Sequence, residues 1–219
     1  MRVIAILPAR NEAPRIADVI AGIKRTRAVG KIIVVDDAST DGTAEAAKRA
    51  GAQVIRFAKR GGVGAATRAG LREALRHSPD GIVFLDADGQ HNPRYIPAFL
   101  KKMTESCDFV IGKRDLSRYP LRKRFGNFML RLLAELVAPT GIEDPECGFR
   151  AMTPDAARRM DLRAQGYSIC MDFVYNVWKN RFRVGCVKIE VPLYHPKKGT
   201  KIVTGFANFW WLLKRRAFG

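Results

Sequence analysis

Short apolar runs alternate with longer amphipathic segments through the first half of the chain. The runs are nearly continuous in valine, isoleucine and leucine, which is typical of strands buried on both faces of a sheet; they lie at residues 3–7, 31–35, 53–57, 82–85 and 109–112. Between them, apolar positions recur every three to four residues and predict a helix that opens near Pro14 and others at 43–50, 63–77 and 92–105. The alternation predicts an α/β fold with a mainly parallel sheet and helices on both faces.

The pattern changes after Gly112. Residues 113–124 hold six basic side chains and one acidic one, and an apolar helical segment follows at 125–137. The remaining predicted elements are strands at 149–152 and 184–191 and helices at 154–160, 171–181 and 204–216. Because no linker is long enough to separate two domains, we expect one domain over 1–204 and an amphipathic C-terminal helix at 205–219.

The charge balance indicates an anionic partner. The 219 residues include 39 Lys and Arg against 21 Asp and Glu, a net charge of +18, which attracts nucleic acid, a lipid surface or a phosphorylated small molecule. No apolar run reaches the roughly 20 residues that span a bilayer. The four cysteines form no C-x-x-C pair. We expect no secretory leader, and free thiols in a reducing cytoplasm.

Acidic side chains follow the fourth predicted strand at Asp86 and Asp88, with Gln90 two residues further on. An open α/β sheet binds its ligand at the carboxyl ends of its strands. Two carboxylates and an amide at that edge suit Mg²⁺ or Mn²⁺, which such sites share with substrate phosphates. The alternative for Asp88 is a structural cap of the turn before Asn92 and Pro93.

The first two strands end in polar residues at the same edge. Asp36 and Asp37 follow the second strand, where an acid can accept hydrogen bonds from a ribose hydroxyl or a base N–H. Pro8, Arg10 and Glu12 follow the first strand. Together with the acidic end of the fourth strand, these residues predict a pocket for one ligand.

A glycine-rich segment at 60–64 precedes the third predicted helix. Backbone N–H groups at a helix start, here around Gly61, suit an anion. The G-x-G-x-x-G fingerprint after the first strand and the G-x-x-x-x-G-K-[ST] motif are both absent. A dehydrogenase and a P-loop ATPase are therefore disfavoured.

Four motifs in this order resemble the motif series of family 2 glycosyltransferases. They are P-A-R-N-E at 8–12, V-V-D-D-A-S-T-D-G-T at 34–43, L-D-A-D-G-Q-H at 85–91 and D-P-E-C-G-F-R at 144–150. The branch most similar is that of the dolichol-phosphate (polyprenol-phosphate) mannose or glucose synthases, and the resemblance covers residues 3 to about 201. It implies a GT-A type domain with a Rossmann-like sheet, a nucleotide-diphosphate sugar donor, Mg²⁺ or Mn²⁺, and inverting transfer of a hexose.

The resemblance implies roles on the donor side of the site. Asp86, Asp88 and Gln90 match the metal-binding triplet, with Asp88 also a catalytic candidate. The residues that match positions lining the nucleotide are Pro8, Arg10, Glu12 and Asp37, and Arg10 stands where the family usually has an aromatic residue. With Asp36, Gly61, Asp86 and Lys201, these residues form the expected nucleotide-sugar site.

The resemblance also implies roles on the acceptor side. Arg114, with Arg118 or Arg122, is similar to the arginines that hold an acceptor phosphate, and Lys198 and Lys201 to a basic loop that closes over both substrates. For individual members of this basic set, a solvated surface is the alternative. Arg114 is a catalytic candidate, and so is Asp172, which lies where related enzymes carry an acidic or amide residue near the sugar.

Family members that use lipid phosphates act at membranes. The C-terminal segment places Phe209, Trp210 and Leu213 beside Lys214 and other basic residues, which predicts an interfacial helix. The alternative is that the tryptophans pack against the domain or a partner subunit. We expect a cytoplasmic protein attached peripherally to the cytoplasmic face of a membrane, with a nucleotide sugar and a polyprenyl phosphate as partners.

Three other functions are weighed against lipid-phosphate glycosylation. A glycosyltransferase acting on a soluble acceptor fits the same motifs. A nucleic-acid-binding module would interleave aromatic with basic residues, but within 113–124 only Tyr119 qualifies, and we expect no nucleic-acid partner. A nucleotidyltransferase would place a glycine-rich loop after the first strand, where this chain has P-A-R-N-E.

Overall fold

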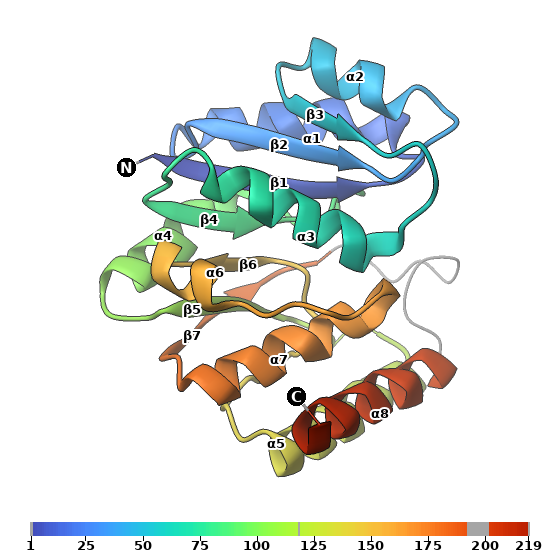
Figure 1. Cartoon of the computed structure of the whole chain (residues 1–219), viewed down its shortest axis with the longest axis vertical. Helices are drawn as coiled ribbons and strands as arrows, with labels where there is room; N and C mark the ends of the chain where they lie inside the picture. Colours follow the sequence, from blue (N-terminus) through green and yellow to red (C-terminus); the bar gives the residue numbers. More distant parts are fainter. Residues whose placement is uncertain (1, 118, 192–201, 219) are drawn as a thin grey trace.

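A seven-stranded sheet forms the middle layer of the molecule, in the strand order β3-β2-β1-β4-β6-β5-β7 (Figure 1). The computed structural model describes residues 2–117, 119–191 and 202–218, and the side chains of all of these except 202–206. The strands are β1 (Val3–Ala9), β2 (Lys31–Asp36), β3 (Gln53–Arg56), β4 (Gly81–Phe84), β5 (Phe109–Arg114), β6 (Arg150–Met152) and β7 (Val184–Ile189).

The sheet is parallel except at β6. β1 pairs in parallel with β2 and β4, β2 with β3, and β5 with β7. β6 lies between β4 and β5 and runs antiparallel to both. Because β4 and β5 are both antiparallel to β6, they run in the same direction, and all strands other than β6 end at one edge of the sheet. The predicted α/β fold with a mainly parallel sheet is confirmed.

Helices cover both faces of the sheet, with α3 in front and α1 behind in Figure 1. The helices before β5 are α1 (Ala13–Arg25), α2 (Thr43–Arg49), α3 (Gly62–Leu75), the 3₁₀ turn η1 (Pro93–Tyr95) and α4 (Ile96–Thr104). Those that follow are α5 (Leu121–Val137), α6 (Pro154–Arg159), the 3₁₀ turn η2 (Gly166–Ser168), α7 (Ile169–Asn180) and α8 (Ile202–Phe218). The central strands β1, β2 and β4 are thus shielded from water, which explains their unbroken apolar sequences.

Aromatic side chains lock helices onto the sheet. Phe173 of α7 meets Phe84 of β4 edge-on with ring centroids 5.8 Å apart. On α4, Phe99 stacks on Phe149, which directly precedes β6, with centroids 4.1 Å apart. Each of these rings is almost fully buried, and burying a phenylalanine contributes about 1.5–3 kcal/mol. These ring contacts therefore hold α7 against β4 and α4 against the start of β6.

Helices α5, α7 and α8 form a further layer beside β7 and β5 (Figure 1). α8 packs against α7, α5 and η2. Among the described residues, no helix combines the length and apolar character needed to cross a bilayer. The four cysteines are free, as expected from their spacing.

The observed elements match the predicted ones with shifts of a few residues at their ends. The largest shift is in α5, which begins at Leu121 and not at Phe125. Pro120 occupies its N-cap position; proline's fixed φ and missing N–H suit a helix start. The polar residues 122–124 form the first turn, so the apolar pattern alone placed the start too late.

Candidate functional site

The carboxyl ends of β1, β2 and β4 meet at one edge of the sheet because these strands are neighbours. β1 lies between the other two, with Ala9 opposite Asp36 and Ile6 opposite Phe84. The loops that follow the three strands carry the residues predicted for the donor and the metal. The structure therefore brings the three acidic or polar strand ends together.

Side-chain hydrogen bonds tie the loop after β1 to the loop after β2. The backbone N–H of Asn11 donates to Ser39 Oγ at 2.9 Å, and Asn11 Oδ1 accepts from the N–H of Thr40 at 3.0 Å. The N–H of Glu12 donates to Thr43 Oγ1 at 2.9 Å. Asn11 itself has a positive φ of 52°, a conformation that asparagine tolerates better than most residues. Pro8, Arg10 and Glu12 thus lie on a loop with a fixed shape.

Asp37 joins the end of β2 to the start of α3. Its Oδ1 accepts the N–H of Gly61 at 2.6 Å, and its Oδ2 accepts the N–H of Gly62 at 2.9 Å. Gly62 has a φ of 82°, which glycine adopts without strain. Asp37 is almost fully buried. The N–H groups at this helix start, which were predicted to face a ligand anion, thus donate to the Asp37 carboxylate, and both oxygens of Asp37 support the backbone here. The roles of Asp37 and Gly61 in nucleotide binding stay predictions.

Asp36 is fully buried beneath the same loops. One carboxylate oxygen, Oδ1, accepts the N–H of Ser39 at 3.1 Å. The other, Oδ2, lies 3.4 Å from Nε of Arg56 in an ion pair, although no hydrogen bond to this atom is formed. Both oxygens of Asp36 thus lie beside polar groups of the protein itself.

The acidic loop after β4 exposes Asp86 and Asp88 at the sheet edge. The side chain of Asp86 is 52% exposed, and Asp88 Oδ1 accepts the N–H of Gln90 at 3.0 Å. His91 is buried below them, with Nδ1 3.3 Å from Asp86 Oδ2. Burial lowers the pKa of His91 despite the opposing charge of Asp86. Asp86 therefore lies against a buried side chain, and its carboxylate is accessible to a ligand.

Gly148 makes room for the Asp86 carboxylate. A Cβ at this position would lie 2.5 Å from Asp86 Oδ1 and 2.7 Å from Oδ2. Gly148 belongs to the segment 144–149 that precedes β6. Because β6 runs antiparallel, its amino end meets the carboxyl end of β4 at the functional edge. The fourth sequence motif thus lies beside the third one in space.

The donor atoms at this edge fit a hard divalent cation whose remaining ligands come from substrate. Among the described residues, no group of three or more His, Cys, Asp or Glu side chains is arranged to enclose a metal. Mg²⁺ and its relatives are commonly held by one or two carboxylates plus phosphate and water oxygens. The cradle that Gly148 leaves for the exposed Asp86 carboxylate, with Asp88 two residues away, suits that kind of site.

Arg114, at the end of β5, is held by Asp144 from the same fourth motif. Its Nε donates to Asp144 Oδ2 at 2.7 Å and its Nη2 to Oδ1 at 2.8 Å, a bidentate pair. The Asp144 side chain is 5% exposed and that of Arg114 19%. Burial disfavours the charge of Arg114, but Asp144 outweighs burial and raises the pKa of the guanidinium. Arg114 is therefore a permanent, fixed cation.

A groove of about 700 Å³ opens beside Arg114, between the ends of β5 and β7 and helix α5. Besides Arg114, its basic lining residues are Lys113, Arg124, Arg131 and Lys188, and its acidic ones are Asp115, Glu143, Asp144 and Glu190. Glu143 forms ion pairs with both Lys113 and Arg131. Arg124 and Arg131 were not singled out from the sequence; their spacing of seven residues is the signal, because it places both on one face of a helix. The predicted Arg122 is exposed on α5 but does not line this groove.

Asp172 lies on α7 and is fully buried. Its Oδ2 accepts the backbone N–H groups of Arg163 and Ala164, and its Oδ1 accepts Nε of Arg215 at 2.9 Å. A carboxylate whose two oxygens are occupied in this way supports backbone structure and does not reach a substrate. The catalytic role of Asp172 stays a prediction that these contacts do not favour.

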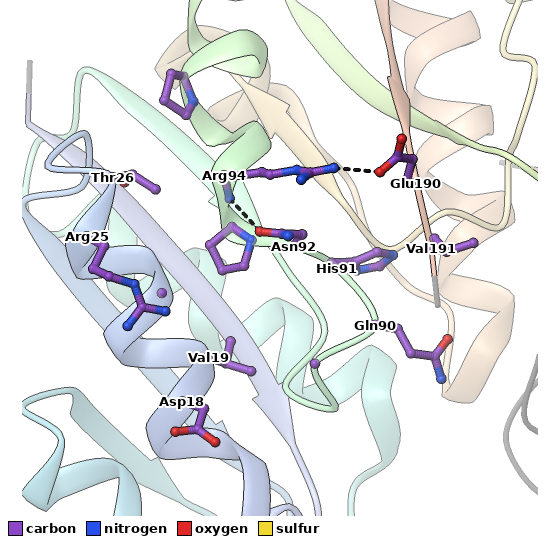
Figure 2. Close-up of a pocket in the computed structure, with 14 residues that line it drawn as sticks. Asp18, Val19, Arg25, Thr26, Gln90, His91, Asn92, Arg94, Glu190 and Val191 are labelled. Atoms are coloured by element: carbon purple, nitrogen blue, oxygen red, sulfur yellow. Dashed lines mark hydrogen bonds and ion pairs between the residues drawn. The ribbon is translucent and has the colours of Figure 1, made fainter. Parts of the chain in front are cut away.

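A second cavity, of about 790 Å³, lies on the other side of the acidic loop (Figure 2). Arg94 reaches across it to Glu190, with Nη2 2.6 Å from Oε2. Of the predicted site residues that the structure describes, Gln90 alone lines this cavity. The remaining predicted residues, Arg118, Lys198 and Lys201, lie outside the residues that the structure describes.

Comparison with known proteins shows what the chain is similar to. The model of the family described as glycosyl transferase family 2 matches residues 4–159. The UDP-N-acetylglucosamine–dolichyl-phosphate N-acetylglucosaminyltransferase of Methanococcus voltae is 29% identical over 95% of this chain and 93% of its own. The undecaprenyl-phosphate mannosyltransferase of Micrococcus luteus is 29% identical over 88% of this chain and 83% of its own.

The fold matches solved structures of the GT-A type. One is glucosyl-3-phosphoglycerate synthase from Mycobacterium tuberculosis, in complex with Mn²⁺, uridine diphosphate and glucosyl-3-phosphoglycerate. The TM-score is 0.76 at 21% identity, and the match covers 98% of this chain and 78% of that one. The expected GT-A type of fold is thus confirmed.

Proposed function

Because the chain belongs to glycosyl transferase family 2 and is a hexosyltransferase, we propose that it moves a hexose from GDP-mannose or UDP-glucose to a polyprenyl phosphate. The observation that carries this proposal is the pairing of two features at one edge of the sheet. The open carboxylate of Asp86 lies beside the segment 144–149, and the same segment fixes Arg114 at the mouth of a basic groove. One feature suits a donor diphosphate and the other an acceptor phosphate.

On the donor side, Asp86 and Asp88 would hold Mg²⁺ or Mn²⁺, with Gln90 beside them. The metal supplies a Lewis acid that stabilises the charge on the departing nucleoside diphosphate. The loop after β1 and the start of α3, shaped by Asp37, line the nucleotide. The fold neighbour from Mycobacterium tuberculosis binds uridine diphosphate and Mn²⁺, which supports a nucleotide and a divalent metal as ligands of this fold.

On the acceptor side, the reaction needs positioning more than it needs a base. A phosphate oxygen of the lipid attacks the anomeric carbon, the bond from that carbon to the diphosphate breaks, and the sugar configuration inverts. A phosphate monoester is already an anion at neutral pH, so no proton has to be removed first. Arg114, Arg124, Arg131 and the lysines of the groove would offset the repulsion between two phosphates and orient the nucleophile.

The lipid acceptor rests on the two curated relatives, which act on dolichyl phosphate and undecaprenyl phosphate. A soluble phosphorylated acceptor is the second candidate, because the fold neighbour from Mycobacterium tuberculosis is a glucosyl-3-phosphoglycerate synthase. The exposed apolar face of α5 favours the lipid. Its large side chains are Leu121, Phe125, Phe128, Leu132 and Leu136, each between 44% and 76% exposed.

These five side chains, the α5 stripe, recur every three or four residues and so share one side of the helix. Phe128 also lines the basic groove, which makes the apolar face continuous with the proposed phosphate site. Arg122, Arg124 and Arg131 flank the stripe on the same helix. An apolar stripe with basic flanks is typical of a helix that lies in an anionic membrane surface. The α5 stripe therefore joins the C-terminal helix as a candidate membrane contact.

The donor claim is tested by isothermal titration with GDP and UDP in the presence of Mn²⁺. Asp88→Asn should weaken nucleotide binding at least about tenfold, because a metal ligand is lost. Asp155→Asn, an exposed acid on α6 with a 74% exposed side chain, is the matched control. Equal affinity in Asp88→Asn and the wild type would refute metal-assisted donor binding at this edge.

The acceptor claim is tested by incubation with radiolabelled GDP-mannose or UDP-glucose, with short polyprenyl phosphates and with 3-phosphoglycerate in parallel. Sugar-labelled lipid is the expected product, and turnover of the soluble acceptor alone would overturn the lipid assignment.

The α5 stripe is tested by co-sedimentation with vesicles of phosphatidylglycerol and phosphatidylcholine. Phe125→Ser with Leu132→Ser should reduce binding. Unchanged sedimentation, or a stripe that is buried in a dimer in solution, would remove it as the membrane contact.

A further inference from the structure

The buried face of α8 is unusually polar. Among the α8 side chains that the structure describes, 207–218, those at most 5% exposed are Asn208, Leu212 and Arg215, spaced by four and three positions. Polar groups cost free energy when they are buried without partners, so a helix that only completed the core would present apolar side chains. The polar contacts of Asn208 and Arg215 therefore need an explanation other than burial.

Arg215 connects α8 to the loop 161–166, which packs against the start of α3. Its Nε pairs with Asp172, whose other oxygen holds the backbone N–H groups of Arg163 and Ala164. Its Nη2 donates to the backbone oxygen of Asp161 at 2.6 Å. The guanidinium also lies 4.5 Å from the ring centre of Tyr175. One side chain of α8 thus holds both ends of the segment 161–164.

The segment 164–166 is in direct contact with the start of α3. A Cβ at Gly64 would lie 2.3 Å from the backbone oxygen of Ala164, and one at Gly62 would lie 3.5 Å from the N atom of Gly166. Arg68 of α3 also donates to the Ala164 oxygen. Since Gly62 is held on its other side by Asp37, a continuous set of contacts joins Arg215 to the proposed nucleotide pocket.

Asn208 makes a second connection, to the metal side of the pocket. Its Nδ2 donates to Oε1 of Glu146 at 3.4 Å, and its Oδ1 accepts the hydroxyl of Ser168 at 3.1 Å. Glu146 lies two residues before Gly148, which contacts Asp86. Arg215 thus connects α8 to the start of α3, and Asn208 connects it separately to the segment 144–149.

We propose that Asn208 and Arg215 are positioning residues: through them α8 holds the start of α3 and the segment 144–149 in the arrangement that binds the nucleotide sugar. The inference deepens the proposed function and rests on it for the identity of the ligand. Neither residue touches substrate in this arrangement. Each acts through a neighbour, Arg215 through Asp172 and Asn208 through Glu146.

The experiment compares three full-length variants with the wild type at a temperature where all are folded. Arg215→Met should raise the KM for the nucleotide sugar about tenfold with a smaller change in kcat, because pocket geometry and not chemistry is altered. Asn208→Ala should raise the KM about threefold without leaving a buried charge unpaired. Arg158→Met, which replaces an exposed arginine on α6, is the matched control and should leave both constants unchanged.

A double variant separates positioning from general destabilisation. Arg215→Met leaves the Asp172 carboxylate buried without its cation, whereas Arg215→Met with Asp172→Asn removes both charges and keeps an acceptor for the backbone N–H groups. The double variant should therefore recover part of the lost affinity. A double variant no better than Arg215→Met would contradict the proposed route through Asp172.

Amide hydrogen exchange on the ligand-free protein supplies a readout that is independent of the substrate. In Arg215→Met, exchange should quicken at 61–66 and 163–166 and stay unchanged in β1 and β2. Unchanged exchange at 61–66 together with an unchanged KM would overturn the proposal, and so would equal quickening throughout the chain. If the wild type bound no nucleotide at all, the proposed function would fail, and the exchange pattern would still decide whether α8 positions the pocket.

Discussion

Gly148→Ala is expected to disable the acidic edge without unfolding the protein. The φ of Gly148 does not lie in the left-handed region, so alanine meets no backbone strain. Its Cβ would lie 2.5 Å from Asp86 Oδ1 and 2.9 Å from Cγ. Ordinary contact begins near 3.4 Å, so the carboxylate must move by about 0.9 Å. Because the Asp86 side chain is half exposed, it can rotate away at little cost to the fold.

The size of the effect follows from the precision that metal ligation requires. Ligand distances in metal sites vary by only about 0.2 Å, and a misplacement of about 1 Å near a reacting centre can cost about a hundredfold in rate. We expect kcat/KM to fall between about 10- and 100-fold, or about 1.4–2.7 kcal/mol in transition-state stabilisation. The free energy of unfolding should change by less than about 1 kcal/mol, since the strain is relieved at the surface.

The measurements are sugar transfer, Mn²⁺-dependent binding of GDP and UDP, and urea denaturation. Gly126→Ala is the matched control, because a Cβ at that position of α5 meets nothing within 4 Å. It should stabilise the helix by about 0.5–1 kcal/mol and leave transfer unchanged. A Gly148→Ala enzyme with wild-type nucleotide affinity and turnover would refute the argument that Asp86 must occupy the space beside Gly148.

Two further predictions concern single side chains outside the donor pocket. Hydrogen bonds from Arg183 lower the pKa of Asp108 below its ordinary 3.8, so the stability that this pair contributes is complete above that pH and is lost as the pH falls through the lowered value. Urea denaturation below about pH 4 should therefore show a steeper loss of stability in the wild type than in Asp108→Asn, and equal slopes would contradict the pairing. Burial and the nearby Asp144 raise the pKa of Cys147 to about 12, so the native thiol should resist Ellman's reagent at pH 8 and react after unfolding; rapid reaction in the native protein would show that the site opens.

Much of the donor side could be predicted from the sequence because it depends on local order along the chain. Continuous apolar runs located the parallel strands, and in a parallel sheet the residues after neighbouring strands share one edge. Asp37 and Asp86 could therefore be grouped without any knowledge of strand order. The roles of the individual donor-side residues remain predictions, since geometry alone does not test them.

The acceptor side was harder to predict because it depends on contacts between distant segments. Arg114 forms its ion pair with Asp144, thirty positions further along the chain. Lys188 lines the same groove from β7. Pairing of Asp172 with Arg215 spans an even larger separation. Neither an apolar pattern nor a motif specifies which buried acid meets which base, so the position of Asp172 in the structure could not be derived from its place in the sequence.

The reversed strand β6 sets an order for the assembly of this protein. β1, β2 and β3 pair within the first 56 residues, whereas Met152 of β6 pairs with Ile82 of β4, and β6 must insert between β4 and β5, which both lie well before it in the chain. Closing such long loops is entropically costly and slow compared with local pairing. During refolding, the nucleotide half is therefore expected to become protected first, and catalytic competence should return only when β6 enters the sheet and brings Gly148 to its place beside Asp86.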